Sequence, residues 1–398
     1  MKSKNVLILL ETSTGFDRSL LLGIAKFLRY HSSWSVFADP PYFRDIKSPG
    51  FFSKIEKLGL DGIILREPGV YMVPHAQIMR QFAAMGLPII AVSSTVEKVE
   101  QITTIRTNND AIGQLGAEHF FERGFQNFGF CGFTDLSWSD ERGAGFAKRV
   151  IEKGHRVSFY SEKESKLWAW SDSVKKPMAE WIRSLPKPVG IMACNDHRGQ
   201  QVIDACKVAG ARVPDDVAIL GVDNDLIYCD LSSPQLSSIA LNAEKGGFEA
   251  AVLLDRLMKS GRAKRPDQIV VEPQYIVTRV STDSIAVEDA DVANTIRFIR
   301  EHIRENLQIN DILNALSISR SKLYEKFQKL VGCSLYDEIH RVKVEKIAGL
   351  LIESNNSISV IAMDYGYTDL KNFSRYFKQI KGLSPKEYRD KYSNKRQF

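Results

Sequence analysis

The stretch "VGIMACNDHRGQQVIDACKVAGARVPDDVAILGVDN", residues 189–224, contains two short apolar runs on either side of a segment of helix length. The runs at 189–195 and 217–224 both end in polar residues, and residues 196–210 lie between them. Continuous apolar runs of this length are typical of strands that are buried on both faces of a parallel sheet. The stretch therefore predicts a strand–helix–strand unit of an α/β domain.

The same alternation of apolar runs and amphipathic segments continues toward the N-terminus. Strands are predicted at 5–11, 61–66, 87–93 and 128–133, with helices at 17–31 and 109–124. About ten such strands are too many for one sheet of ordinary size. We therefore expect two doubly wound halves that together occupy residues 1–280.

Four of the predicted strands end in short polar side chains. Ligands of open α/β sheets bind just beyond the carboxyl ends of the strands, so these side chains are candidates for a shared cleft. Helix capping is the alternative for each residue alone, since Ser, Thr, Asp and Asn are also preferred N-caps. Four such ends together favour a site, and they are Glu11-Thr12-Ser13, Ser93-Ser94, Asn195-Asp196 and Asp223-Asn224.

The net charge is concentrated at one end of the chain. The 398 residues carry a net charge of +6. From Arg320 to the C-terminus there are 16 Lys and Arg against 9 Asp and Glu, or +7, so the remainder sums to −1. A neutral body with a basic end is expected of a protein that binds a polyanion. A basic surface that only keeps the protein in solution is the alternative.

The chain lacks the sequence signals of several protein classes. Its five cysteines form neither a CxxC pair nor a cluster with histidines, so we expect no disulfide framework and no metal site. No GxGxxG or Walker motif is present, and the lone GxG of "RGAGF" (142–146) lies in a predicted helix, so we expect no nucleotide cofactor. The apolar run at 6–10 is too short for a signal peptide, and no run reaches membrane-spanning length. These features predict a cytoplasmic protein without a membrane partner.

Only helical periodicity continues beyond residue 292. We expect a linker at 281–291 and an all-helical domain at 292–398, attached to the α/β part. Two segments of that domain, 309–332 and 358–382, share one plan of a short helix, a tight turn and a second helix. This plan describes a helix-turn-helix. A long amphipathic helix at 334–354 is predicted to hold both units.

The second helix of each unit can be divided into two faces. Phe373, Phe377 and Ile380 follow i, i+4, i+7 spacing and predict a core stripe, as do Leu323, Phe327 and Leu330. The opposite faces are predicted to read the major groove of DNA. They consist of Leu370, Lys371, Ser374 and Arg375 in one helix and Arg320, Ser321, Tyr324 and Glu325 in the other. For Lys322, Lys326, Lys329, Lys378 and Lys381, phosphate contacts and simple solvation remain equal alternatives.

The segment "SISVIAMDYGYTDLKNFSRYFKQIKGLSPKEYR" (357–389) resembles the signature of the AraC/XylS family. The matching features are the "IA…GY" turn, the "FSRYFK" helix and the "SPKEYR" tail, and the resemblance covers residues 292–390. It implies binding to double-stranded DNA. Glu325 departs from the family pattern, and an acidic residue there would accept a hydrogen bond from cytosine or narrow the range of sequences bound.

The cues "IMACNDHRGQQVIDACKVAGARVPDDVAILGVDND" and "SPQLSSI" resemble the effector domain of the lactose-repressor family over residues 4–280. The resemblance implies the fold of type I periplasmic sugar-binding proteins, with two lobes, three crossovers and a sugar between the lobes. It implies ligand contacts from Asp223, from Asn195 or Asp196, and from Arg142. Trp138 is either a stacking surface for the sugar or a core residue. The first lobe adds Phe16, Asp17 and Arg18 at the start of its first helix.

A lactose-repressor-like sensor ahead of an AraC-type domain resembles the bacterial xylose operon regulators. This resemblance implies a transcription activator that forms a homodimer through its sensor domains. It also implies a sugar effector, with D-xylose as the leading candidate, and RNA polymerase as a further partner. A hexose, purine or sugar-phosphate effector is one alternative. A Rossmann-like sugar-processing enzyme is the other, but the chain has no phosphate loop and no visible catalytic constellation.

Overall fold

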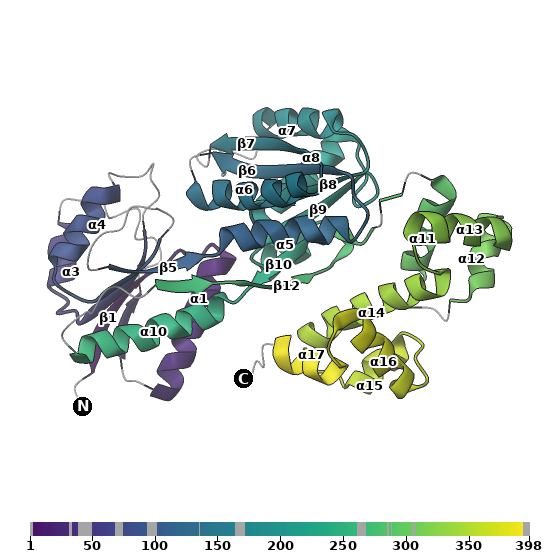
Figure 1. Cartoon of the computed structure of the whole chain (residues 1–398). Coiled ribbons are helices and arrows are strands. Elements are labelled where there is room, and N and C mark those ends of the chain that lie inside the picture. The colour runs from purple at the N-terminus through teal and green to yellow at the C-terminus, as the bar shows by residue number, and fades with distance from the viewer. Residues whose placement is uncertain are drawn as a thin grey trace.

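The computed structural model describes residues 3–31, 34–38, 50–67, 75–93, 102–134, 136–163, 172–260, 268–284, 286–287, 289–304 and 307–392. Figure 1 shows two α/β lobes and a helical domain that lies beside the second lobe. The predicted fold class, a two-lobed α/β sensor followed by an all-α domain, is confirmed.

The N-terminal lobe is built on a parallel sheet with the strand order β11-β5-β4-β3-β1-β2. Its central strands are buried on both faces, as the continuous apolar runs predict. The elements are β1 (Lys4–Leu9), α1 (Gly15–His31), β2 (Trp34–Ala38), α3 (Phe51–Glu56), β3 (Gly62–Arg66), α4 (His75–Ala84), β4 (Ile89–Val92), β5 (Ile102–Thr107), α10 (Ala243–Ser260) and β11 (Gln268–Val271).

The C-terminal lobe has the order β12-β10-β9-β8-β6-β7, and only the pairing of β10 with β12 is antiparallel among the described strands. Its elements are α5 (Asn109–Phe121), β6 (Asn127–Thr134), α6 (Ser137–Glu152), β7 (Val157–Lys163), α7 (Asp172–Ser184), β8 (Val189–Ala193), α8 (Asp196–Ala209), β9 (Val217–Val222), α9 (Leu226–Leu231), β10 (Ser237–Leu241), β12 (Pro273–Val277) and the 3-10 helix η2 (Val280–Thr282).

The chain crosses between the lobes three times, as expected: after β5, after β10 and after β11. The three crossings are hydrogen-bonded to one another. Asn108 donates from Nδ2 to Glu272 Oε2 at 2.8 Å, and the Glu272 amide donates to Asn242 Oδ1 at 2.8 Å. These contacts join the three crossing segments into one connection between the lobes.

The lone GxG of the sequence has a packing role. A Cβ on Gly145 of α6 would stand 2.5 Å from the Asp110 carbonyl oxygen, and one on Gly113 of α5 would stand 2.3 Å from the Arg142 carbonyl oxygen. Such distances are too short for any side chain, so glycine is required where α5 and α6 cross. The motif therefore allows close contact of two helices.

The helical domain contains α11 (Ala290–Glu301), α12 (Ile309–Leu316), α13 (Arg320–Val331), α14 (Leu335–Glu353), α15 (Ile358–Asp364), α16 (Leu370–Lys381) and α17 (Pro385–Tyr392). The long helix α14 contacts α11, α13, α15, α16 and α17, so it is the common support that the sequence predicted. A single apolar core, which includes Leu323, Phe327, Phe373 and Phe377, joins the helices. Leu330 was predicted to belong to it but is 46% exposed, because it lies in the last turn of α13, beyond the core contact.

Candidate ligand cleft and nucleic-acid interface

The first helix contributes a buried carboxylate to the N-terminal side of the cleft. Asp17 has no exposed surface; it accepts hydrogen bonds from the Glu11 amide at 2.8 Å and from Arg66 Nε at 2.6 Å. The Arg66 guanidinium also lies over the ring of Phe16, 5.7 Å from its centroid. Asp17 and Phe16 thus hold Arg66, which is the last residue of β3 and was not among the predicted site residues.

Arg18 reaches across the cleft to the other lobe. Its Nη2 lies 2.5 Å from Asp225 Oδ2, and its Nη1 donates to the Thr12 carbonyl at 2.8 Å. Asp225 also caps α9 by accepting from the Ile227 amide. A Cβ on Gly15 would stand 2.6 Å from Asp225 Cβ, so the two lobes meet closely at this point.

A second bridge between the lobes lies at the base of α5 and α6. Arg106 of β5 is 3.3 Å from Glu141 of α6. Asn109 donates to the other oxygen of Glu141 at 2.8 Å and accepts from Arg142 Nε at 2.9 Å. Asn109 therefore contacts both Glu141, which belongs to this bridge, and the side chain of Arg142.

Arg142 and Asp223 form the centre of the C-terminal wall. Arg142 is 4% exposed, donates to the Cys194 carbonyl at 2.6 Å, and lies 5.0 Å from the Trp138 ring centroid. Its Nη2 is 3.8 Å from Asp223 Oδ1, which is beyond hydrogen-bond distance. No described residue donates a hydrogen bond to this buried oxygen. Burial raises the pKa of Asp223 to about 6, against the opposing effect of Arg142.

The polar pair after β8 lies behind this wall. Asn195 caps α8 by accepting from the Arg198 amide at 2.9 Å. Asp196 is 1% exposed and accepts from Ser238 Oγ at 2.5 Å and from the Asp225 amide at 2.7 Å. Burial and the nearby Asp223 raise the pKa of Asp196 well above its usual range. Asp196 therefore supports the loop that carries Asp223 and Asp225, whereas the Asn195 side chain caps α8.

The residues that follow β8 and β9 contact each other, and Arg18 of the helix after β1 pairs with Asp225 after β9, whereas Ser94 of the fourth predicted strand end lies outside the described residues. The sequence interpretation missed Arg66, Asp225, Asn109 and Glu141. Arg66 and Asp225 also lie at strand ends, so the rule that selected Asp223 could have included them. Nothing in the sequence distinguishes Asn109 and Glu141, because their partners come from other elements.

The predicted DNA-reading faces are turned to solvent. On α16, Leu370, Lys371 and Arg375 are exposed and Ser374 is half-buried, while Phe373 and Phe377 face the core. On α13, all four predicted residues, Arg320, Ser321, Tyr324 and Glu325, are exposed.

The turns before α13 and α16 use left-handed backbone, at Ser317 (φ 51°) and Gly366 (φ 79°). In each of these helices an arginine lies over a tyrosine ring: Arg320 over Tyr324 and Arg375 over Tyr376, at 5.6 and 5.4 Å. These stacks restrict the two guanidinium groups at the surface.

Three of the uncertain lysines have partners inside the chain, and one of them, Lys322, lies 3.5 Å from Asp291. Lys326 donates to Asp289 and Asp291 at 2.7 Å each, and Lys381 donates to Glu345 at 2.6 Å. These lysines therefore form ion pairs within the chain, whereas the sequence suggested either phosphate contacts or simple solvation.

Residues 117–282 match the periplasmic binding protein-like domain, and residues 312–391 match the helix-turn-helix domain. The chain is 30% identical to the xylose operon regulatory protein of Escherichia coli K12, over 98% of this chain and 97% of that protein. The chain belongs to this family of regulators. The Haemophilus influenzae member is 26% identical over 96% of this chain and 97% of its own. The solved structure of the xylose-binding transcription activator XylR superposes with a TM-score of 0.65 at 28% identity, over 99% of this chain and all of that one.

Membership of the xylose operon regulator family confirms the prediction of a DNA-binding transcription regulator. Its relatives are regulators rather than enzymes, which decides against the enzyme alternative. Within the described parts of the chain, no helix combines the length and apolar character needed to cross a bilayer.

Proposed function

We propose that this regulator is an activator whose effector is D-xylose or a closely related pentose, bound between the two lobes. The observation that carries the proposal is Asp223 Oδ1, which is buried in the cleft wall without a described donor. Leaving a buried acceptor unpaired costs about 1–3 kcal/mol, and a sugar hydroxyl would supply the missing donor. The pentose itself is suggested by the names of the relatives from E. coli and H. influenzae.

The charge balance of the cleft favours a neutral ligand over a sugar phosphate. Each of four arginines around the cleft faces a carboxylate, so the positive charge is already compensated. A phosphate group would require cationic side chains that are not committed in this way. Hydroxyl groups, in contrast, both donate to carboxylates and accept from guanidinium groups. The pairs are Arg18–Asp225, Arg66–Asp17, Arg106–Glu141 and Arg142–Asp223.

Isothermal titration calorimetry with D-xylose, L-arabinose, D-glucose, adenine and xylose 5-phosphate tests the effector class. Asp223→Ala should weaken D-xylose binding by about 100-fold or more, because hydrogen bonds to a charged acceptor are lost. Asp204→Ala, which removes an exposed carboxylate of α8 paired with Lys207, is the matched control and should bind as the parent does. Tighter binding of any other member of the panel would reject the pentose. Equal affinities of Asp223→Ala and the parent would remove Asp223 from the site.

We further propose that the exposed faces of α13 and α16 read base edges. Arg320 and Arg375 are the side chains best suited to guanine, because each guanidinium fork can donate twice. Ser321, Tyr324, Glu325, Leu370, Lys371 and Ser374 complete the two faces.

Assembly and cellular context belong to the same proposal. A sensor of this type is expected to form a homodimer, to contact RNA polymerase and to act in the cytoplasm at a promoter. Sedimentation equilibrium with and without D-xylose tests the dimer, and a monomer at micromolar concentration in both conditions would reject it. For the domains we propose residues 1–280 for the sensor, 281–291 for the linker and 292–398 for the DNA-binding domain.

A further inference from the structure

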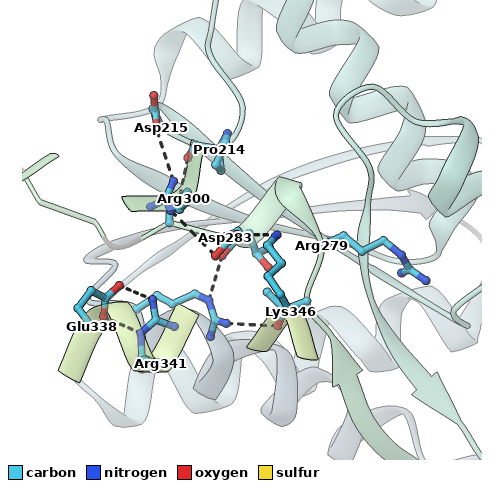
Figure 2. A network of polar contacts seen from close by, with 12 residues as sticks. Pro214, Asp215, Arg279, Asp283, Arg300, Glu338, Arg341 and Lys346 are labelled. Carbon is cyan, nitrogen blue, oxygen red and sulfur yellow. Dashed lines mark hydrogen bonds and ion pairs between the residues drawn. The ribbon is translucent and has the colours of Figure 1, made fainter. Parts of the chain in front are cut away.

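The DNA-binding domain is attached to the sensor through ion pairs, of which the one formed by the buried Asp283 is central, as well as through the linker. Asp283, just after η2, lies 2.9 Å from Lys346 of α14 and 4.0 Å from Arg300 of α11. Asp215, in the turn before β9, lies 3.1 Å from Arg297 and 3.9 Å from Arg300. Figure 2 shows the side chains of Asp215, Asp283, Arg300 and Lys346 between the lobe and the two helices. We call the set of Asp215, Asp283, Arg297, Arg300 and Lys346 the polar joint.

The centre of the polar joint is charged despite its burial. Asp283 is 4% exposed, and burial alone would raise its pKa. Lys346, Arg300 and Arg341 reverse that effect, so the pKa of Asp283 lies below its usual range. Removing one partner of such a buried pair leaves the other charge without compensation, which is why the joint resists separation.

The segment that carries Asp283 is fastened to the interior of the C-terminal lobe. Ser281 and Thr282 have no exposed surface. Ser281 Oγ donates to the Ile219 carbonyl of β9 at 2.6 Å, and Thr282 Oγ1 donates to Ser237 Oγ of β10 at 2.8 Å. Arg123, which follows α5, donates to the Thr282 carbonyl at 3.0 Å. A shift of this segment would therefore break several buried hydrogen bonds, so Asp283 moves with β9 and β10.

The same segment begins with a residue that reaches back to the cleft. Arg279 is 7% exposed and donates from Nη2 to Asn224 Oδ1 and from Nη1 to the Leu236 carbonyl, both at 3.0 Å. Its amide donates to Ser237 Oγ at 2.8 Å. Figure 2 shows its side chain directed away from Asp283. Arg279 thus contacts the loop after β9 with its side chain and begins the segment that leads to Asp283.

Asn224 follows Asp223, and both have left-handed backbone, with φ of 49° and 103°. This conformation is costly for residues other than glycine, and it persists only where neighbouring contacts impose it. The hydrogen bond from Arg279 is one such contact, and the bond from the Asn224 amide to Ser238 Oγ at 2.9 Å is another.

We propose that Arg279 is a positioning residue that couples the sugar cleft to the polar joint, so that occupancy of Asp223 changes how α11 and α14 dock on the sensor. The inference rests on the proposed function, because it takes Asp223 as a ligand contact. The Arg279 guanidinium fixes the loop that carries Asp223, and the Arg279 backbone begins the segment that carries Asp283. Lysine at this position would keep the charge but could not donate to Asn224 and Leu236 together in the planar fork geometry.

The test measures the coupling between the two ligands rather than either affinity alone. The Kd for D-xylose is determined with and without a saturating promoter fragment, and the Kd for the fragment with and without sugar. Thermodynamic linkage requires the two ratios to be equal, and couplings of about 5- to 150-fold are usual. In Arg279→Gln and in Asp283→Asn the ratio should fall to within about twofold of unity. Lys259→Gln, which removes an exposed lysine that is paired with Asp255 on α10, should keep the parental ratio.

A sugar-independent measurement separates failure of this inference from failure of the proposed function. In the sugar-free protein, Arg279→Gln should increase hydrogen–deuterium exchange both around Asn224 and in α14. Faster exchange around Asn224 with unchanged exchange in α14 would overturn the inference, whether or not the protein binds D-xylose. A parental coupling ratio in Arg279→Gln would overturn it as well. If that variant does not fold, Arg279→Lys replaces it with the same two expected outcomes.

Discussion

The raised pKa of Asp223 predicts that sugar binding depends on pH in a defined direction. In the sugar-free protein this pKa is about 6, because the carboxyl group is buried. The group is therefore mostly protonated at pH 5 and ionised at pH 8. A sugar whose hydroxyl groups donate to the carboxylate must displace the proton, so its binding competes with protonation. Affinity should consequently fall as the pH is lowered through 6.

The expected magnitude follows from the same value. If only the ionised form binds, the apparent Kd rises by a factor of 1 + 10^(pKa − pH), which at pH 5 is about tenfold relative to pH 8. This corresponds to about 1.4 kcal/mol. Arg142, Asp225, Arg66 and Asp17 are charged neighbours that act on Asp223, and Asp196, whose own pKa is raised, interacts with Asp223 as well. The pH dependence should therefore come from Asp223, with Asp196 as the neighbouring group that the variant below separates from it.

Calorimetric titrations of D-xylose at pH 5, 6, 7 and 8 measure this directly. At pH 5 the binding enthalpy should also depend on the ionisation enthalpy of the buffer, because close to one proton is released. Asp223→Asn should bind more weakly and lose the dependence. Asp196 remains in that variant, so a tenfold dependence that survives there would assign the titration to Asp196 instead. Equal affinity from pH 5 to pH 8 in the parent protein would refute the reasoning.

Other predictions concern DNA recognition, helix packing and lobe closure. Arg375→Ala should weaken promoter binding by about 1–3 kcal/mol in an electrophoretic mobility assay if it contacts a base, whereas an equal loss on random DNA would make it a phosphate contact. Gly145→Ala should lower the melting temperature, because the new Cβ would stand 2.5 Å from a carbonyl oxygen of α5. The new Cβ of Gly349→Ala in α14 would have no neighbour within 4 Å, so this substitution should raise the stability by up to about 1 kcal/mol. A higher melting temperature for Gly145→Ala than for Gly349→Ala would contradict the packing argument. Arg18→Gln should speed sugar dissociation in stopped-flow measurements, since the bridge to the other lobe is lost, and an unchanged rate would show that the bridge does not retain the ligand.

The two-lobed fold and the helical domain could be predicted from the sequence, because the patterns that indicate them lie within short segments of the chain. A strand buried on both faces needs a continuous apolar run, and β8 and β9 have one. A recognition helix needs an apolar stripe at helical spacing, which Phe373 and Phe377 provide. Leu330 obeyed the same spacing but lies at the end of its helix, where the neighbouring helices no longer cover the position.

The candidate site could be predicted from the sequence only in part, because the type of a residue does not say which contacts its side chain makes. Asn195 and Asp223 both follow buried strands, yet Asn195 caps a helix whereas Asp223 presents a buried oxygen without a described donor. Arg18 and Asp225 are 207 residues apart in the chain, so no local pattern could pair them. Arg279 has no motif at all, and its role depends on contacts with two distant segments.

By itself, the amino-acid sequence determined the α/β sensor, the two helix-turn-helix units, the exposed faces of α13 and α16, and the polar side chains at the strand ends. Each of these follows from hydrophobic periodicity or from residues adjacent in the chain. Only the tertiary structure decided which carboxylates remain available in the cleft, which lysines are held in internal ion pairs, and how Asp283 fastens the DNA-binding domain to the sensor. Burial and charge pairing arise between segments that the chain brings together only when it folds.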